Sequence, residues 1–520
     1  MSYITKYIDK QKIKTSFIFT YFLGFLAHGF SFFNLQVSHD CLSEFTLSYS
    51  WKIRLGRYFK PIYDIFFGKY ISLPWINGLI TLFWLSLCAY LIVEIFSIQK
   101  RRYIAIVCGI LCTNITVTTF NASFLHDICA DMFGIFITIL STYLWKLLFD
   151  TNSNKQKALL FAGISFLLCL SLGIYQSFIT IYISLVLIIS VLKLTDIQKT
   201  ISWKIVWKYD FIGAFACLCG GVLYYLGLKL ILAVTGFHLI EGNYNSLTNL
   251  TSNTEPLAGR VATTFTQFFD RFFNAKGYAY SNFVPRVIFI MLGIFVLVST
   301  VTIVIQLIKK NTPWQNIASA FLFLLLLPFA MNLLRMLNPT VHELMIYSYW
   351  FIYILFLLII CRYLEIKPNK IIENITIVLM CCFIWINIQT ANALYAKKNM
   401  DQQATNSVMT RVVERIEMLD GYIPGVTPVT FVGTPSTYLL ESVDYSEVDT
   451  LFGAGNSSIT YQEVFPNYMS LILKVNMNII KNNYAYEQNY ISEDDVEKMP
   501  VFPSKDGIQM INDTVVVKFQ

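Results

Sequence analysis

The run IYSYWFIYILFLLIIC at 346–361 contains no charged residue, and FLFLLLLPFAMNLL at 321–334 is equally apolar. A run of about 20 mostly apolar residues is long enough to cross a bilayer as one helix. The whole chain of 520 residues follows this pattern, being 56% hydrophobic and 14% charged, whereas a soluble domain carries roughly 25% charged residues. The sequence therefore predicts an all-α polytopic membrane bundle.

We expect about eleven transmembrane helices. They fall near 15–36, 75–97, 103–120, 132–150, 158–172, 178–193, 210–235, 287–308, 315–334, 343–362 and 371–390. The N-terminus is basic, and no small-residue cleavage site follows its apolar stretch, so we interpret that stretch as a retained first span and not as a signal peptide.

Basic residues gather in the segments that eleven spans place on the N-terminal side of the membrane. These are Lys6, Lys10, Lys12 and Lys14, then Lys100–Arg102, Lys155/Lys157, Lys199/Lys204/Lys208, Lys309–Lys310 and Arg362/Lys367/Lys370. The positive-inside rule makes this side cytoplasmic, so the N-terminus is predicted to be cytoplasmic. The net charge of +7 is thus interpreted as a signal of orientation and not of nucleic-acid binding.

The predicted topology divides the chain into a transmembrane domain at 1–390 and an external domain at 391–520. The main external segments of the first domain are 37–74, 121–131 and 236–286. In the second domain, 399–419 has an amphipathic helical pattern, while PVTFVGTP at 428–435 and DTVVVKF at 513–519 are typical of strands. We expect a small α/β domain, periplasmic if the chain lies in a bacterial inner membrane, with a docking or scaffolding role.

Two external segments share one acidic pattern: VSHDCLSE at 37–44 and FLHDICAD at 124–131. Each has His-Asp followed four residues later by another acid, which pairs Asp40 with Glu44 and Asp127 with Asp131 on a helix face. The simplest interpretation is that Asp40 caps a helix. However, paired carboxylates repel, and desolvation at a membrane end raises a carboxyl pKa. Carboxylates retained under both costs indicate a functional site.

Two kinds of chemistry use such a cluster. A carboxylate can accept the proton of an attacking hydroxyl in glycosyl transfer, or several can bind a divalent metal. No His-x-x-x-His or His-Glu-x-x-His spacing occurs, so no metal or other cofactor is expected to be required. Fingerprints of ATP loops, nucleophile elbows and dinucleotide folds are also missing. The cytoplasmic loops are too short for a nucleotide-binding domain, so a lipid carrier is the natural sugar donor.

One external segment, WKIRLGRYFKPIYDIFFGK at 51–69, is basic although it lies on the side where basic residues are rare. Its basic and aromatic residues suggest a helix lying in the membrane interface, with Arg54, Arg57 and Lys60 on one face. This face would either attract anionic lipid in general or bind one lipid phosphate, since arginine holds phosphate through a planar fork.

These features resemble the polytopic GT-C glycosyltransferases that use lipid-phosphate sugars, and most closely the Gtr-type O-antigen glucosyltransferases that change bacterial serotype. The matching stretches are SHDCLSE, Trp51, the Leu-Gly-Arg-Tyr run at 55–58, HDICAD and the external C-terminal part. The resemblance implies transfer of glucose from undecaprenyl-phosphate-glucose to lipid-linked O-antigen or lipopolysaccharide. It also implies that Asp40 is the catalytic base. His39 stands where many relatives have a second acid, so Glu44 is left as a possible partner in this role.

The resulting hypothesis assigns three sets of residues. Asp40 and Glu44 are catalytic, and Arg54, Arg57 and Lys60 bind the lipid phosphate. The residues expected to orient the donor or acceptor are His39, His126, Asp127, Asp131, His342 and Glu343.

Three alternatives remain open at this point. A transporter or flippase usually places charges near the bilayer midplane, where this sequence has few. An O-antigen polymerase would use the segment 236–286, with His238, Arg260 and Arg271. A scaffold without activity would make the paired acids accidental. Most of the eleven cysteines lie in apolar spans, but Cys41 and Cys129 lie inside the acidic motifs and would form a disulfide if they met.

Overall fold

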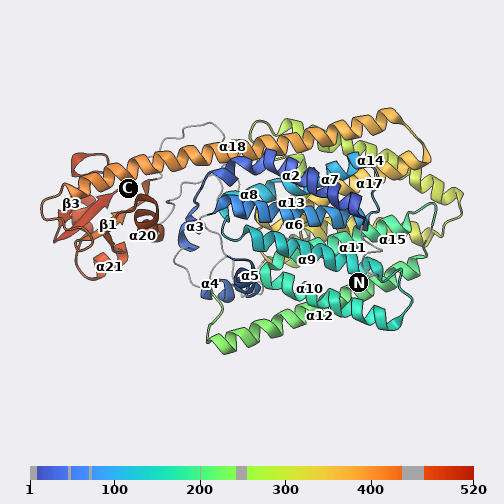
Figure 1. Ribbon diagram of the computed structural model, residues 1–520, viewed down its shortest axis with the longest axis horizontal. Coiled ribbons are helices and arrows are strands. Elements are labelled where there is room, and N and C mark those ends of the chain that lie inside the picture. The colour runs from blue at the N-terminus through green and yellow to red at the C-terminus, as the bar shows by residue number, and fades with distance from the viewer. Residues whose placement is uncertain are drawn as a thin grey trace.

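The computed structural model describes residues 9–44, 49–68, 73–199, 201–241, 255–435, 459 and 462–520. In this part of the chain, eleven helical segments are long and apolar enough to cross a membrane, which confirms the predicted bundle (Figure 1). They are α2 (Lys10–Phe33), α6 (Pro74–Ile95), α7 with α8 (Arg101–Ser123), α9 (Ile128–Leu147), α10 (Asn154–Ile174), η1 with α11 (Gln176–Leu194), α12 (Trp203–Thr235), α14 (Phe283–Lys309), α15 (Trp314–Met331), η4 with α17 (Tyr347–Ile366) and α18 (Lys370–Glu417).

The spans differ greatly in how much protein surrounds them. In the span Arg101–Ser123, 94% of the most apolar window is buried, whereas only 11% is buried in Trp203–Thr235. The span Arg101–Ser123 is thus central in the bundle. The span Trp203–Thr235 presents its apolar side chains outward, as a helix facing lipid does. Apolar length, which the sequence reveals, does not distinguish these two positions.

The central span is broken where α7 (Arg101–Thr113) meets α8 (Ile115–Ser123). Asn114 has an extended backbone at this point, and its side chain accepts a hydrogen bond from the backbone N–H of Val117 at 3.1 Å. The Asn114 amide also donates to the carbonyl of Ile110 at 2.9 Å. One asparagine therefore satisfies both broken helix ends inside the bundle, where an unpaired backbone group is costly.

The single intramembrane histidine joins three spans. His28 on α2 is fully buried, and its Nδ1 lies 2.8 Å from the hydroxyl of Tyr395 on α18. Its Nε2 lies 2.8 Å from the carbonyl oxygen of Cys112 on α7. Both ring nitrogens are thus satisfied, and His28 has a packing role in the bundle.

Helix α18 does not end at the predicted domain boundary of 390/391. It continues for 48 residues, and Leu394 and Tyr395, beyond that boundary, are fully buried in the core of the membrane bundle. Figure 1 shows α18 running along the bundle and carrying the C-terminal domain to the end where α3, α4 and α5 lie. We call this end of the molecule the acid-bearing end.

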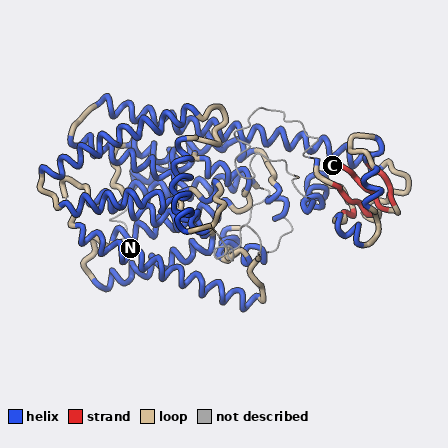
Figure 2. Tube along the Cα trace, turned by 180° about the vertical axis from the view of Figure 1, so that it is seen from behind, coloured by secondary structure: helices blue, strands red, loops and turns tan. Residues whose placement is uncertain are grey.

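The C-terminal domain contains a small sheet, which confirms the predicted α/β character and both predicted strands (Figure 2). Its strands are β1 (Pro428–Val432), β2 (Asn478–Ile479), β3 (Ile508–Ile511) and β4 (Thr514–Lys518), in the order β2-β1-β4-β3. Strand β1 is parallel to β2 and β4, while β3 and β4 are antiparallel. Short helices α20 (Phe465–Asn467), α21 (Asn482–Glu487) and α22 (Glu493–Lys498) complete the domain.

This domain packs directly on the first external segment. Val37, Leu42 and Leu125 belong to the same apolar cluster as Val412 and Phe465 of the C-terminal part. The amide of Asn467 also donates a hydrogen bond to the carbonyl of Leu42 at 2.8 Å. The domain therefore holds the short helix α3 (His39–Glu44) in place from outside the bundle.

The eleven predicted spans would place Gln520 on the opposite side of the membrane from the first span's N-terminal end. We predict that alkaline phosphatase fused after Gln520 is active in a bacterial host, because this enzyme folds only outside the cytoplasm. The same reporter placed after Thr151, between α9 and α10, should be inactive. Enzymatic activity normalised to fusion abundance measures both, and the reverse pattern would contradict the predicted orientation.

Candidate active site

The first acidic motif forms a short helix, α3 (His39–Glu44), whose N-cap is Ser38. The Ser38 hydroxyl accepts a hydrogen bond from the backbone N–H of Cys41 at 3.2 Å and donates to the carbonyl of Ser123 at 2.5 Å. The interpretation that Asp40 caps this helix is therefore wrong. Asp40 lies in the first turn with 31% of its side chain exposed, so its carboxylate is accessible to a substrate.

Helix α3 ends at Glu44, whose side chain lies outside the described part of the structure, so its catalytic role stays a prediction. His39, one residue before Asp40, places its Nε2 3.3 Å from Oδ2 of Asp40. Burial lowers the pKa of His39 more than the nearby carboxylate of Asp40 raises it. The imidazole is thus neutral near pH 7 and does not neutralise Asp40.

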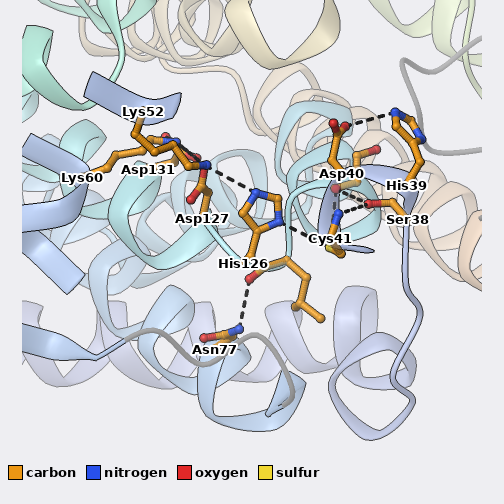
Figure 3. Close-up of polar contacts among 12 residues, drawn as sticks. Ser38, His39, Asp40, Cys41, Lys52, Lys60, Asn77, His126, Asp127 and Asp131 are labelled. Atoms are coloured by element: carbon orange, nitrogen blue, oxygen red, sulfur yellow. Dashed lines mark hydrogen bonds and ion pairs between the residues drawn. The ribbon is translucent and has the colours of Figure 1, made fainter. Parts of the chain in front are cut away.

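The second acidic motif covers the end of the connection from α8 and the first turn of α9, and it is buried. Only 3% of the Asp127 side chain and 2% of the Asp131 side chain are exposed. The Lys60 Nζ lies 2.9 Å from Asp127 Oδ2 and 2.9 Å from Asp131 Oδ1, and the Lys52 amine forms a further ion pair with Asp127 (Figure 3). We call Lys52, Lys60, Asp127 and Asp131 the buried ion network.

The lysines of this network come from the basic external segment. The expectation of one interfacial helix with Arg54, Arg57 and Lys60 on a common face is wrong. The segment forms two helices, α4 (Ser50–Arg54) and α5 (Phe59–Phe67), and Lys60 is directed inward to the carboxylates. Its predicted role in binding lipid phosphate thus has to compete with two ion pairs.

Gly56 explains why the predicted helix stops. Its φ is 76°, a left-handed conformation that glycine adopts without steric cost. The N–H of Arg57 donates to the carbonyl of Lys52 at 2.8 Å, and the N–H of Gly56 donates to Ile53 at 2.9 Å. These two bonds form a Schellman motif, the common way to end a helix at glycine. The turn at 55–58 thereby separates Lys52 and Arg54 on α4 from Lys60 on α5, and Arg57 lies in the turn itself.

Outside the membrane-spanning helices, the buried ion network shifts the pKa values of Asp127 and of its neighbour His126. Burial raises the pKa of Asp127, but Lys52 and Lys60 outweigh it and hold that pKa well below its usual value. Desolvation was expected to raise carboxyl pKa values at this membrane end; for Asp127 the lysines reverse the direction. Burial lowers the pKa of His126, yet the neighbouring Asp127 carboxylate raises it overall.

A histidine bridge joins the two acidic motifs. His126 Nδ1 lies 3.4 Å from Sγ of Cys41, and its Nε2 lies 3.6 Å from Oδ2 of Asp127. Burial raises the pKa of the Cys41 thiol, but His126 and Lys398 outweigh burial and lower this pKa to about 7. The predicted proximity of the two motifs is thus present, with Cys41 next in sequence to Asp40. Cys129 instead contacts Asn77, at 3.4 Å from its carbonyl oxygen, and both cysteines are free thiols.

The two arginines of the first external segment retain capacity to bind an anion. Arg54 donates through Nε to the carbonyl of His238 at 3.0 Å, and the Arg57 guanidinium lies 4.5 Å from the ring centre of Tyr175. Within the described part of the chain, neither has a carboxylate within 4.0 Å, and the buried Nε of Arg57 has no hydrogen-bond partner. A phosphate placed beside them would meet unpaired guanidinium donors.

His342 and Glu343, which are predicted to orient the donor or acceptor, lie on other elements than the two acidic motifs. Glu343 begins η3 (Glu343–Met345), and its Oε1 lies 3.4 Å from Nη1 of Arg271 on α13 (Leu257–Phe273). The Glu343 backbone carbonyl accepts a hydrogen bond from Thr116 of α8 at 2.9 Å. His342 precedes η3 and is half-buried. Their predicted role in orienting substrate stays a prediction.

No group of three or more His, Cys, Asp and Glu side chains suitable for a metal ion occurs within the described ranges. The carboxylates of the second motif are matched by lysine amines, which occupy the places where a cation would bind. The need for a divalent metal stays untested.

Asp40, whose carboxylate is partly exposed, and the arginines Arg54 and Arg57 belong to one external segment of a helical membrane bundle. Glycosyl transfer can use a carboxylate that accepts a proton and guanidinium groups that bind phosphate. The family model "Glucosyl transferase GtrII" matches residues 29–343 and so includes both acidic motifs and the basic segment. The chain belongs to this glucosyl transferase family, as its resemblance to Gtr-type enzymes implied. No curated protein and no solved structure matches it significantly.

Sequence reasoning missed Lys52 and the bridging role of Cys41. A signal for Lys52 existed, because five basic residues in an external segment break the usual charge rule and require a reason. Opposing carboxylates supply that reason. The contact between Cys41 and His126 joins residues 85 positions apart and has no local signal.

The ion network predicts a specific pattern of stability. Lys60→Met removes the amine shared by two buried carboxylates and should destabilise the protein by roughly 3–5 kcal/mol, the usual cost of an uncompensated buried charge. The double variant Lys60→Met/Asp131→Asn keeps the Lys52–Asp127 pair balanced and should recover most of this loss. Thermal unfolding of the purified protein in detergent measures both. Equal destabilisation by the single and double variants would contradict the network.

Proposed function

We propose that this glucosyltransferase transfers a glucosyl residue from undecaprenyl-phosphate-glucose to lipid-linked O-antigen or lipopolysaccharide. Transfer would take place on the periplasmic face of the bacterial inner membrane. Family membership supports glucosyl transfer itself. The choice of a lipid-phosphate donor rests on the guanidiniums of Arg54 and Arg57, which have no carboxylate within 4.0 Å in the described residues and belong to the same external segment as Asp40.

The observation that carries this proposal is the contrast between the acids. Asp127 and Asp131 are buried and paired with lysines, whereas 31% of the Asp40 side chain is exposed and no lysine or arginine contacts it within the described residues. A general base has to reach the proton that it accepts, so Asp40 fits this role and the buried pair does not.

In the proposed reaction, Asp40 accepts the proton of the attacking hydroxyl as that oxygen bonds to C1 of the glucose. The bond between C1 and the phosphate oxygen breaks, and the lipid phosphate leaves with the electron pair. Arg57 and Arg54 match the charge that develops on the phosphate. A single displacement of this kind inverts the configuration at C1.

The buried ion network has a positioning role in this proposal. It fixes α4 and α5 against α9, and so determines where the turn with Arg57 lies. His126 extends the network to Cys41, adjacent to Asp40. The predicted orienting function of Asp127, Asp131 and His126 would therefore act through these contacts and not by touching the sugar.

Neither the transporter nor the polymerase reading gains a specific observation. The arginines that a polymerase would use are engaged within the fold, since Arg271 pairs with Glu343 and Arg260 donates to the backbone carbonyl of Glu255 at 2.8 Å. Glucosyl transfer is therefore the function that we propose.

Asp40→Asn should abolish transfer while leaving the protein folded. Loss of a general base costs roughly 10²–10⁴-fold in rate. The assay expresses each variant in a host that makes lipid-linked O-antigen, quantifies membrane abundance and measures added hexose by mass spectrometry. Asp494→Asn, an exposed acid on α22, is the matched control and should retain full activity. Wild-type transfer by Asp40→Asn at equal abundance would refute the assignment.

His39 predicts the acid limb of the pH profile. Because burial holds its pKa below the usual value of 6.5, His39 stays neutral at pH 7 and becomes protonated only at lower pH. The imidazolium would then pair with Asp40 and weaken it as a base, so activity should be level near pH 7 and fall below pH 6.5. His39→Gln should preserve activity to lower pH. Identical profiles for wild type and His39→Gln would show that His39 does not influence Asp40.

A further inference from the structure

A polar cavity lies at the end of the bundle opposite the acid-bearing end. It has a volume of about 730 Å³ and is lined by the helix ends around 95–103, 189–198 and 358–366, together with Lys146. Lys146 lies on α9, the helix that begins beside Asp127. Fifteen residues separate it from Asp131, or about 22 Å along a helix, so the cavity is remote from the candidate active site.

The cavity is rich in positive charge. Its lining includes the basic residues Lys100, Lys146, Lys193 and Arg362, against two acids, Asp196 and Glu365. Lys100 is exposed and pairs with Glu373 at 2.8 Å. Arg362 donates to the Thr195 hydroxyl at 2.8 Å and lies 3.8 Å from Asp196. These two cations have protein partners.

Lys146 and Lys193 form no close ion pair in the described part of the chain, although the carboxylate of Asp150 interacts with both amines at longer range. Both are half-buried, and within the described residues neither has a carboxylate within 4.0 Å. Lys146 donates to the carbonyl of Glu94 at 2.9 Å, and the Lys193 amine lies 4.2 Å from the ring centre of Phe149. Partly desolvated ammonium groups are costly without a counter-charge, and two that line one cavity also repel each other.

We propose that this cavity binds a phosphate-bearing anion, which Lys146 and Lys193 share and which Arg362, another residue of the lining, also contacts. Its volume lies in the range of ligand sites, roughly 300–1,000 Å³. Basic pockets between membrane helices are known to hold phospholipid head groups. Apolar lining residues such as Ile189, Leu192 and Leu358 would accommodate the start of an acyl chain. The phosphate could come from an anionic phospholipid or from a soluble phosphate, and the proposal does not depend on the glucosyl transfer.

The test uses the purified full-length protein in a non-ionic detergent, with thermal unfolding as the readout and ionic strength held constant. One arm titrates inorganic phosphate; the other adds dioleoylphosphatidylglycerol, with dioleoylphosphatidylcholine as the uncharged control. The variant Lys146→Gln/Lys193→Gln removes both unpaired charges. Lys155→Gln/Lys208→Gln removes two exposed lysines at the same end and controls for general electrostatics.

We expect the phosphatidylglycerol arm, the phosphate arm or both to raise the unfolding temperature of wild type. The double variant should weaken the apparent affinity about tenfold or more, while the control variant should match wild type. A response to phosphatidylglycerol alone identifies a lipid head group, and a response to both identifies the phosphate itself. If the double variant does not fold, Lys193→Gln, which loses only a ring contact, carries the same comparison.

The proposal is overturned if wild type responds to neither probe. It is equally overturned if the cavity variant responds like wild type, since any binding would then occur elsewhere, for example at Arg54 and Arg57.

Discussion

Two lysines and two aspartates, buried together at one end of a membrane bundle, determine the arrangement of the candidate site. A charge removed from water needs a partner of opposite sign, and here each carboxylate lies against a lysine amine. Because the lysines belong to α4 and α5 while the acids belong to the start of α9, the network joins the first external segment to the second. These ion pairs also determine the position of the turn between α4 and α5, which contains Arg57.

The two acidic motifs read almost alike but have different environments. Asp127 and Asp131 face lysines and are excluded from solvent, whereas Asp40 lies in the first turn of a capped helix at the surface. The contacts from Cys41 through His126 to Asp127 hold the two motifs close together, although their carboxylates differ in solvent exposure. The C-terminal domain contributes from the other side, since Asn467 and its apolar neighbours pack on α3. The helix that carries Asp40 therefore packs against both the membrane bundle and the C-terminal domain.

The sequence predicts the eleven spans because apolar length is a local property, and it predicts the strands at 428–432 and 514–518 from their β-branched residues. It misses the pairing of Lys60 with Asp131, because that contact joins residues 71 positions apart. The break at Gly56 has a local signal, because a glycine within a basic run favours the end of a helix. The prediction of one continuous helix did not take this glycine into account. The predicted boundary at 390 lies within a continuous helix, because composition changes there while α18 runs from Lys370 to Glu417.

The central claim is that the buried acids position the site and that Asp40 accepts the proton. The most direct measurement is the initial rate of glucosyl transfer by the charge-balanced variant Lys60→Met/Asp131→Asn, compared with that of Asp40→Asn at equal folded abundance. The account predicts that the balanced variant stays within about tenfold of wild type, whereas Asp40→Asn loses roughly 10²-fold or more. Comparable losses in both variants would contradict the account, because Lys60 or Asp131 would then contribute as much to the rate as the proposed base.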